Sequence, residues 1–175
     1  MQTEIASLLG LPDGLEVVST AVADRILTIN VVAIAKSSTC PLCAQPATRV
    51  RSSYTRQVAD APCAVHRVQL ILSVRKFRCE TVDCPRQIFT ERFAPFLKPW
   101  ARMTTRLSQM IEAIGLATCG ELGARLAPHL GVQTSPTTVL RSTMALPTCP
   151  PEHVSLLGID AREFPPRPQI RHYSC

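Results

Sequence analysis

Two cysteine pairs have the spacing of a metal site. Two residues separate Cys40 from Cys43, and four separate Cys79 from Cys84. A short turn with a cysteine at each end points two thiolates at one ion, and tetrahedral Zn²⁺ takes four such ligands at about 2.3 Å. We therefore predict a structural zinc site with these four thiolates as ligands. The alternatives are two disulfides or four unrelated core thiols, and disulfides are disfavoured because nothing at the N-terminus suggests export.

Two other cysteines are not expected to bind this metal. Cys63 lies between the two pairs, next to Pro62, but four thiolates already fill a tetrahedral site. Cys119 falls between two expected helices. We predict both to be small buried residues in the core.

The elements around the cysteine pairs are expected to be strands. Strand-like composition and alternation occur over residues 15–19, 25–35, 49–59, 65–77 and 87–92. In the run 65–77, Val68, Leu70, Leu72 and Val74 alternate with polar residues, so this set is expected to face a core. We interpret residues 14–93 as a small antiparallel β domain whose folding depends partly on zinc, because its core is small.

Helical patterns precede and follow this region. Residues 3–11, within an N-terminal segment 1–13, predict a short amphipathic helix, and 94–100 is a proline-containing hinge. Three helices are then predicted, over residues 101–116 with Gly115 closing the first, over 121–130, and from Pro136 to about residue 146 with Ser135 as N-cap. This layout, over residues 101–147, is typical of a helix-turn-helix, and the alternative is an unspecialised three-helix bundle. The predicted fold class is α+β.

Positive charge is concentrated near the cysteine pairs. The chain of 175 residues has a formal charge of +6, but residues 49–106 hold twelve basic and four acidic side chains, a net of +8. Clustered guanidinium groups suit phosphate contacts, and the alternative is a plain solvated surface. The predicted phosphate contacts are Arg49, Arg51, Arg56, Arg75, Lys76 and Arg78, and those expected to read bases from the third helix are Thr137, Thr138 and Arg141.

Several motifs together resemble one family. They are Leu8-Leu-Gly-Leu11, Cys40-Pro-Leu-Cys43, Val74-Arg-Lys-Phe-Arg-Cys79 and Cys84-Pro-Arg-Gln-Ile-Phe-Thr-Glu-Arg-Phe93. In this order the sequence is similar to the N-terminal part of transposases of the ISL-three insertion-sequence family, roughly over residues 3–160. The resemblance implies a zinc-binding domain and a helix-turn-helix that recognise the terminal inverted repeats of the element.

In that family a ribonuclease-H-like domain follows, which cuts and joins DNA with three carboxylates and two Mg²⁺ ions. Residues 148–160 resemble a linker and the first strand of that domain, and Asp160 corresponds to its first metal-binding carboxylate. Asp160 alone cannot catalyse strand transfer, so we predict that this chain is inactive as an enzyme by itself. Residues 161–175 show no core or strand pattern, and we predict a slipped reading frame near codons 160–164.

The sequence therefore predicts a DNA-binding fragment of a transposase. One alternative is a stand-alone zinc-dependent repressor that occupies the inverted repeats, and another is a zinc-ribbon adaptor whose basic face meets an acidic protein. The N-terminus shows no secretory signal and the most apolar stretch is too short to span a bilayer, so a cytoplasmic protein with no membrane partner is expected. Transposition generally needs paired ends, so a homodimer is expected on double-stranded DNA, although no heptad is present to drive it.

Overall fold

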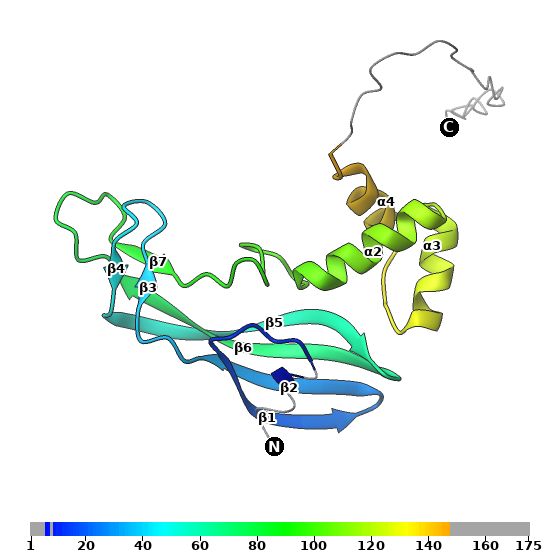
Figure 1. The fold of residues 1–175 in the computed structure, drawn as a ribbon, viewed down its shortest axis with the longest axis horizontal. Helices are drawn as coiled ribbons and strands as arrows, with labels where there is room; N and C mark the ends of the chain where they lie inside the picture. The colour runs from blue at the N-terminus through cyan, green and yellow to red at the C-terminus, as the bar shows by residue number, and fades with distance from the viewer. Residues whose placement is uncertain (1–5, 8, 148–175) are drawn as a thin grey trace, which may run out of the picture.

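The computed structural model describes residues 6, 7 and 9–147 (Figure 1). Its strands are β1 (Leu15–Ala23), β2 (Ile26–Ala33), β3 (Ser38–Thr39), β4 (Pro46–Ala47), β5 (Val50–Cys63), β6 (His66–Arg78) and β7 (Ile88–Thr90). They are followed by α2 (Thr105–Ala117), α3 (Gly120–Leu126), the 3-10 helix η1 (Ala127–Leu130) and α4 (Pro136–Met144). The predicted segments 148–160 and 161–175, with Asp160, lie outside the described residues.

The main sheet has the order β1-β2-β6-β5, and β7 adds to β6. β1 with β2 and β5 with β6 form antiparallel hairpins, as the strand patterns predict, but β2 and β6 pair in parallel, with Ile26 opposite Arg67. The predicted antiparallel domain is therefore wrong at this junction. The chain leaves β2, forms the β3–β4 ribbon, and returns through β5 before β6 runs alongside β2. Parallel pairing thus places the ends of β2 and β6 at the same end of the sheet.

One face of β6 forms the centre of the core. Val68, Leu70, Leu72 and Val74 are buried, which confirms the predicted alternation. They pack with Ile29 and other apolar residues of β1 and β2, and the segments around Leu9 and Leu97 cover them. Burying each such side chain contributes about 1.5–3 kcal/mol, so this cluster is the main source of stability in the sheet.

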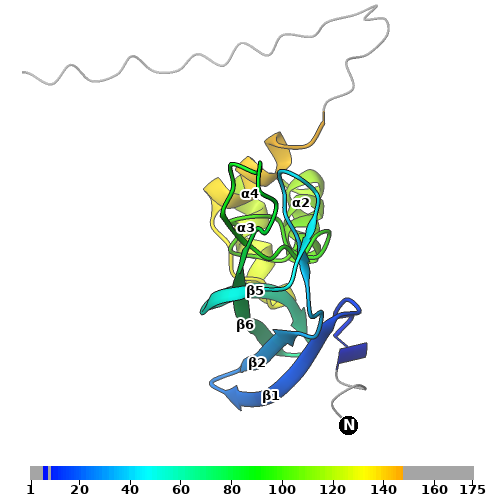
Figure 2. The ribbon, with the colours of Figure 1, turned by 90° about the vertical axis from the view of Figure 1, so that its left-hand side faces the viewer.

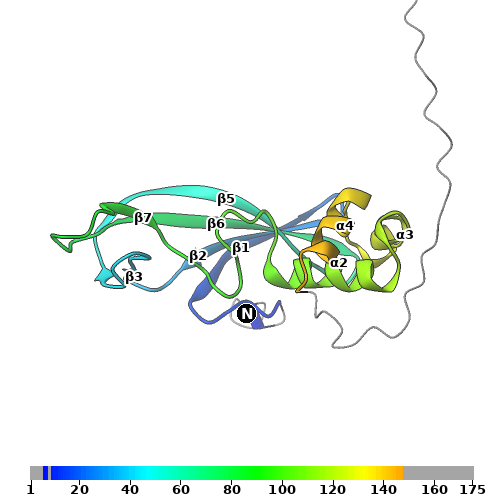
Figure 3. The same cartoon turned by 90° about the horizontal axis from the view of Figure 1, so that it is seen from above.

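The helices lie beyond the β5 edge of the sheet, away from β1 (Figures 1 and 2). Seen from above, β3 and β7 are at one end of the long sheet and α2 to α4 are at the other (Figure 3). Within the described part, no helix is long and apolar enough to cross a membrane.

The prediction of an α+β fold with a helix-turn-helix is wrong. The described part of the chain is mainly β-sheet. Its helices α2, α3 and α4 have only 13, 7 and 9 residues. The apolar stripe that suggested the second helix does not form a core, because Leu122, Leu126 and Leu130 are 56%, 41% and 44% exposed. Periodicity identified helical segments here, but it does not determine whether their apolar faces are covered.

The helix boundaries show where a local sequence signal was sufficient to predict the first residue of a helix. α4 begins at Pro136 with the Ser135 side chain accepting from the amide of Thr138, as predicted. α2 begins four residues later than predicted, because the segment before it pairs with β5: the amide of Ala59 donates to Arg102 and that of Thr104 to Ala59. At the N-terminus, residues 6 and 7 of the predicted helix are helical, and residues 3–5 and 8 lie outside the described part.

The prediction that Gly115 closes the first helix is wrong. Gly115 lies buried inside α2, against α4. A Cβ at this position would be 2.1 Å from Oγ1 of Thr143 and 2.9 Å from Cγ1 of Val139. Glycine therefore allows the two helices to approach closely.

We expect Gly115→Ala to destabilise the protein by about 1–3 kcal/mol, because overpacking costs more than the gain of up to about 1 kcal/mol in helix propensity. Urea unfolding followed by circular dichroism measures the change. Adding Thr143→Ala should recover part of the loss by removing the nearest atom. A Gly115→Ala variant that is more stable than the parent would contradict close packing at this position.

Candidate metal centre

The first cysteine pair lies in the turn between β3 and β4. The amide of Cys40 donates to the carbonyl of Gln45, and that of Ala44 donates to the carbonyl of Cys40, each at 2.9 Å. Ala44 adopts a positive φ of 57°, which closes the turn after Cys43. The local backbone thus holds both thiols of this pair on the same side of the ribbon.

The second pair lies in the loop between β6 and β7. The amide of Cys79 donates to the carbonyl of Gln87 at 2.9 Å, and that of Cys84 donates to Thr81 at 3.2 Å. The parallel pairing of β2 and β6 brings this loop to the same end of the sheet as the first pair.

The four thiols converge as a zinc site requires. All four Sγ atoms lie within 4.8 Å of one another, with Cys40 and Cys84 at 3.9 Å and Cys43 and Cys79 at 3.6 Å. Zinc–sulfur bonds of about 2.3 Å in a tetrahedron place the sulfurs about 3.8 Å apart, whereas a disulfide joins them at about 2.05 Å. The cluster therefore fits one Zn²⁺, and these four cysteines are not paired as disulfides.

A small apolar cluster supports the two loops. Cys40 is buried together with Ala47, Phe77 and Phe89, and Cys43, Cys79 and Cys84 pack against this cluster. Phe77 and Phe89 face each other across β6 and β7, with ring centroids 6.0 Å apart. The cluster contains few side chains, so the metal is expected to supply much of the free energy that keeps the loops folded.

Without a metal the thiols differ in acidity. The backbone hydrogen bond at Gln45 and then the Thr81 hydroxyl lower the pKa of Cys43 to about 6. Burial raises the pKa of Cys84 to about 12. Four thiolates can coexist at this spacing only if a cation compensates their charge.

The metal-binding segment also matches a known family. Residues 36–84 match the family described as zinc-finger of transposase IS204/IS1001/IS1096/IS1165. This segment is similar to the zinc ribbon of that transposase family. A search of curated proteins and a search of solved structures both gave no match. With all four coordination positions supplied by cysteine, the zinc ribbon has the donor set of a structural site rather than a catalytic one.

The two cysteines predicted to be core residues differ in how deeply they are buried. Cys63 is half-buried at the end of β5, whereas Cys119 is exposed in front of α3, so the prediction for Cys119 is wrong. Neither belongs to the metal cluster.

The predicted phosphate contacts do not form one uniform surface. Arg49, Arg51 and Arg78 are exposed within the matched segment 36–84, and the amide of Arg78 donates to the carbonyl of Arg49 at 2.9 Å. Arg75 instead forms an ion pair with the buried carboxylate of Glu91 at 2.7 Å and lies over the Phe77 ring. Its guanidinium is therefore occupied within the fold.

The other two, Arg56 and Lys76, line a pocket that also contacts the first cysteine turn at Pro41. The Arg56 guanidinium donates to the carbonyl of Ala101, and the Lys76 ammonium lies 5.3 Å from the centre of the Tyr54 ring. The residues predicted to read bases are far from this pocket in sequence: Thr137 and Arg141 are exposed on α4, and Thr138 is half-buried at its cap.

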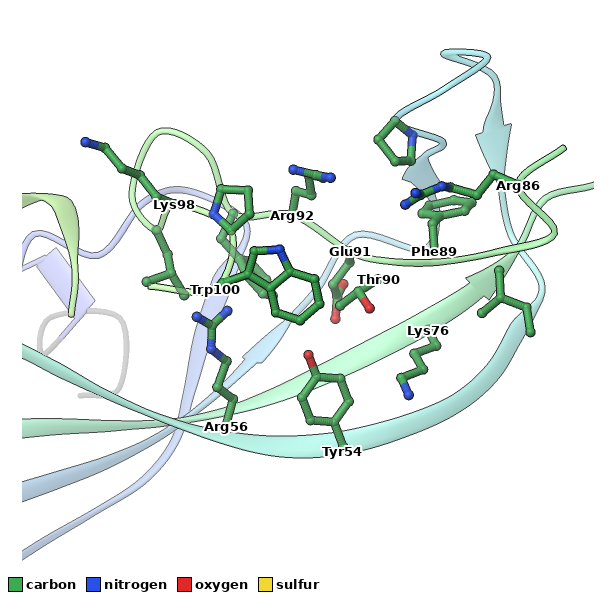
Figure 4. A pocket seen from close by; sticks show the side chains of 15 residues that line it. Tyr54, Arg56, Lys76, Arg86, Phe89, Thr90, Glu91, Arg92, Lys98 and Trp100 are labelled. Atoms are coloured by element: carbon green, nitrogen blue, oxygen red, sulfur yellow. The ribbon is translucent and has the colours of Figure 1, made fainter. Parts of the chain in front are cut away.

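The pocket has a volume of about 320 Å³ (Figure 4). Its walls come from β5, β6, β7, the loop up to Trp100, the first cysteine turn at Pro41 and the β6–β7 loop at Arg86. Sequence reasoning missed Tyr54 and Trp100 as site residues. A usable signal was present: a large aromatic residue next to Pro99 in a loop, within the most basic part of the chain.

Proposed function

We propose that this chain binds double-stranded DNA as the targeting part of a transposase, recognising the terminal inverted repeats of an insertion sequence, and that it does not catalyse strand transfer by itself. The observation that carries the proposal is the transposase zinc ribbon over residues 36–84. A structural zinc site fixes the shape of a surface but supplies no chemistry, which suits a recognition role.

The charge around the zinc ribbon supports this proposal. Arg51 and Arg78 are exposed on the paired strands β5 and β6, Arg49 is exposed just before β5, and Arg86 is exposed in the loop that holds Cys79 and Cys84. Guanidinium groups that are free of internal partners can make bidentate contacts with phosphates. Arg75 is an unsuitable contact, since its ion pair with Glu91 would have to break.

A second part of the proposal concerns α4 and the assembly. Thr137, Thr138 and Arg141 on α4 are proposed as further DNA contacts at the other end of the molecule, in a role that does not depend on a helix-turn-helix. Because transposition generally needs paired ends, we propose a homodimer on DNA in the cytoplasm. Analytical ultracentrifugation with and without DNA tests the assembly.

The affinity for DNA is expected to fall steeply with salt. Each phosphate contact contributes a slope of about −0.9 to the dependence of log K on log salt. We expect Arg78→Ala to weaken binding to all duplexes equally and to reduce the slope by about one. Fluorescence anisotropy with a duplex containing the repeat that flanks the gene, and with a scrambled duplex of equal length, measures both quantities.

The matched control is Arg25→Ala, since Arg25 is an exposed arginine in the turn between β1 and β2, at the opposite end of those strands from the four cysteines. This variant should bind DNA like the parent. An affinity for duplex DNA that is absent or insensitive to salt would contradict the proposed function and favour an adaptor for an acidic protein. Equal affinity for the repeat and the scrambled duplex would contradict recognition of the repeats.

A further inference from the structure

The pocket lined by Arg56, Lys76 and Trp100 continues the core face of the sheet, but with different residue types. On β5, Val58 and Asp60 point into the core, and the same alternation places Arg56 and Tyr54 on that face further along the strand. On β6, Lys76 follows Leu72 and Val74 on this face. The strand pattern therefore stays the same while apolar residues give way to basic and aromatic ones, which is unfavourable for a core and suited to a ligand.

Trp100 is the most exposed aromatic side chain of the pocket, at 90%. An indole left in water on a monomer gains nothing in stability, because most of its apolar area is unburied. Its backbone φ of +64° lies in the left-handed region, which is uncommon for a residue other than glycine and often marks a functional site.

The loop that carries Trp100 is held in place on both sides. The Arg56 guanidinium donates to the carbonyl of the next residue, Ala101, whose amide donates to the carbonyl of Lys98 at 3.2 Å. Further on, the amide of Thr105 donates to the carbonyl of Phe96 at 2.9 Å. The indole is thus presented from a fixed backbone, and Figure 4 shows the Tyr54 ring pointing toward it across the pocket.

The pocket is also strongly positive. Its charged lining consists of Glu91 and five basic residues, namely Arg56, Lys76, Arg86, Arg92 and Lys98. Glu91 does not offset this charge, because its carboxylate is buried and accepts hydrogen bonds from the backbone and side chain of Arg75. The site therefore combines an exposed indole with basic side chains whose charge is not offset by the one carboxylate of the lining, which is the chemistry that binds unstacked nucleotides.

We propose that this pocket binds an unpaired nucleotide of a DNA strand, with the base stacked on Trp100 near Tyr54 and the flanking phosphates contacted by the basic side chains. The inference rests on the proposed function and specifies that the bound part of the DNA end is an unpaired nucleotide. A base within a duplex is stacked on its neighbours and cannot present its face, and a pocket of about 320 Å³ has room for a single nucleotide but not for a duplex. The pocket thus favours DNA with a frayed or single-stranded end.

The test uses Trp100 as its own probe, since it is the one tryptophan in the sequence. The full chain is titrated with a short oligothymidylate, with a duplex that has a thymidine overhang, and with the same duplex with blunt ends. We expect the first two to quench the tryptophan fluorescence and the blunt duplex to leave it nearly unchanged. Quenching by a free nucleoside triphosphate at equal strength would overturn the assignment to a DNA strand.

Affinity measurements on variants give an independent readout. We expect Trp100→Ala to weaken binding of a labelled overhang duplex by roughly tenfold, as loss of one stacked base does, and to leave blunt-duplex affinity unchanged. Trp100→Phe keeps an aromatic face and should retain most of the affinity. The control is Val22→Ala, which removes an exposed apolar side chain at the far end of β1. The free energy of unfolding should be unchanged in all three variants, because Trp100 and Val22 are both exposed.

The results separate this inference from the proposed function. If blunt and overhang duplexes bind equally and the fluorescence does not change, the pocket assignment is wrong, while duplex recognition stands. If only single strands bind, with quenching that requires Trp100, the pocket assignment is upheld and duplex recognition fails.

Discussion

Replacing Cys79 by serine is expected to remove the bound zinc and to unfold the ribbon. The four Sγ atoms lie within 4.8 Å of one another, so the loss of one thiolate leaves three ligands and a weak serine oxygen. Structural zinc contributes about 10–16 kcal/mol in zinc-finger peptides at neutral pH, so a destabilisation of at least several kcal/mol is expected for the segment that it holds. The buried rings of Phe77 and Phe89 would then become exposed.

Zinc content by atomic absorption and thermal unfolding with and without a chelator measure this effect. The parent should contain about one zinc per chain, and chelator should lower its melting temperature towards that of the variant. The matched control is Cys119→Ser, since Cys119 is an exposed thiol outside the cluster. If Cys79→Ser kept both its zinc and its melting temperature, the assignment of the ligands would be wrong.

The second large effect is expected at Asp60, whose carboxylate joins the sheet to the helices. The residue is 4% exposed, and its Oδ1 accepts from the Thr104 hydroxyl and from Nε of Arg106, both at 2.6 Å. A second Arg106 nitrogen donates to Oδ2, and a third donates to the carbonyl of Leu9. One carboxylate thus organises β5, the start of α2 and the N-terminal segment.

We expect Asp60→Ala to destabilise the protein by about 3–5 kcal/mol, because it leaves a partly buried guanidinium without its counter-charge. Asp60→Asn keeps the shape and should cost less. Urea unfolding measures the free energies, with Glu121→Ala as control. The Glu121–Arg125 pair is 64% and 73% exposed, so its loss should cost less than about 1 kcal/mol. Equal effects of Asp60→Ala and Glu121→Ala would show that the buried network does not hold the parts together.

Arg75 shows what charge composition alone leaves open about a contact. Its place in a basic, alternating strand made it a candidate for phosphate binding. The structure pairs it instead with Glu91, sixteen residues further along the chain, where β7 returns beside β6. A side chain's charge is visible in the sequence, but whether an opposite charge neutralises it depends on strand register.

Features that depend on neighbours along the chain were predictable from the order of residues alone. The cysteine spacing predicted the zinc ligands, the period of two predicted the buried residues of β6, and Ser135 with Pro136 predicted the start of α4. Each is a local rule, because a metal-binding turn, a strand face and a helix cap are made within a few residues.

Other features depend on contacts between distant segments and became visible in the folded chain. The parallel pairing of β2 with β6 brings the two cysteine pairs together, and the close approach of α2 and α4 requires Gly115. The helices proved to be short additions to a mainly β fold, and Tyr54 and Trp100 meet at one pocket although 46 positions separate them. These outcomes follow from register and packing across the whole fold, which no local pattern encodes.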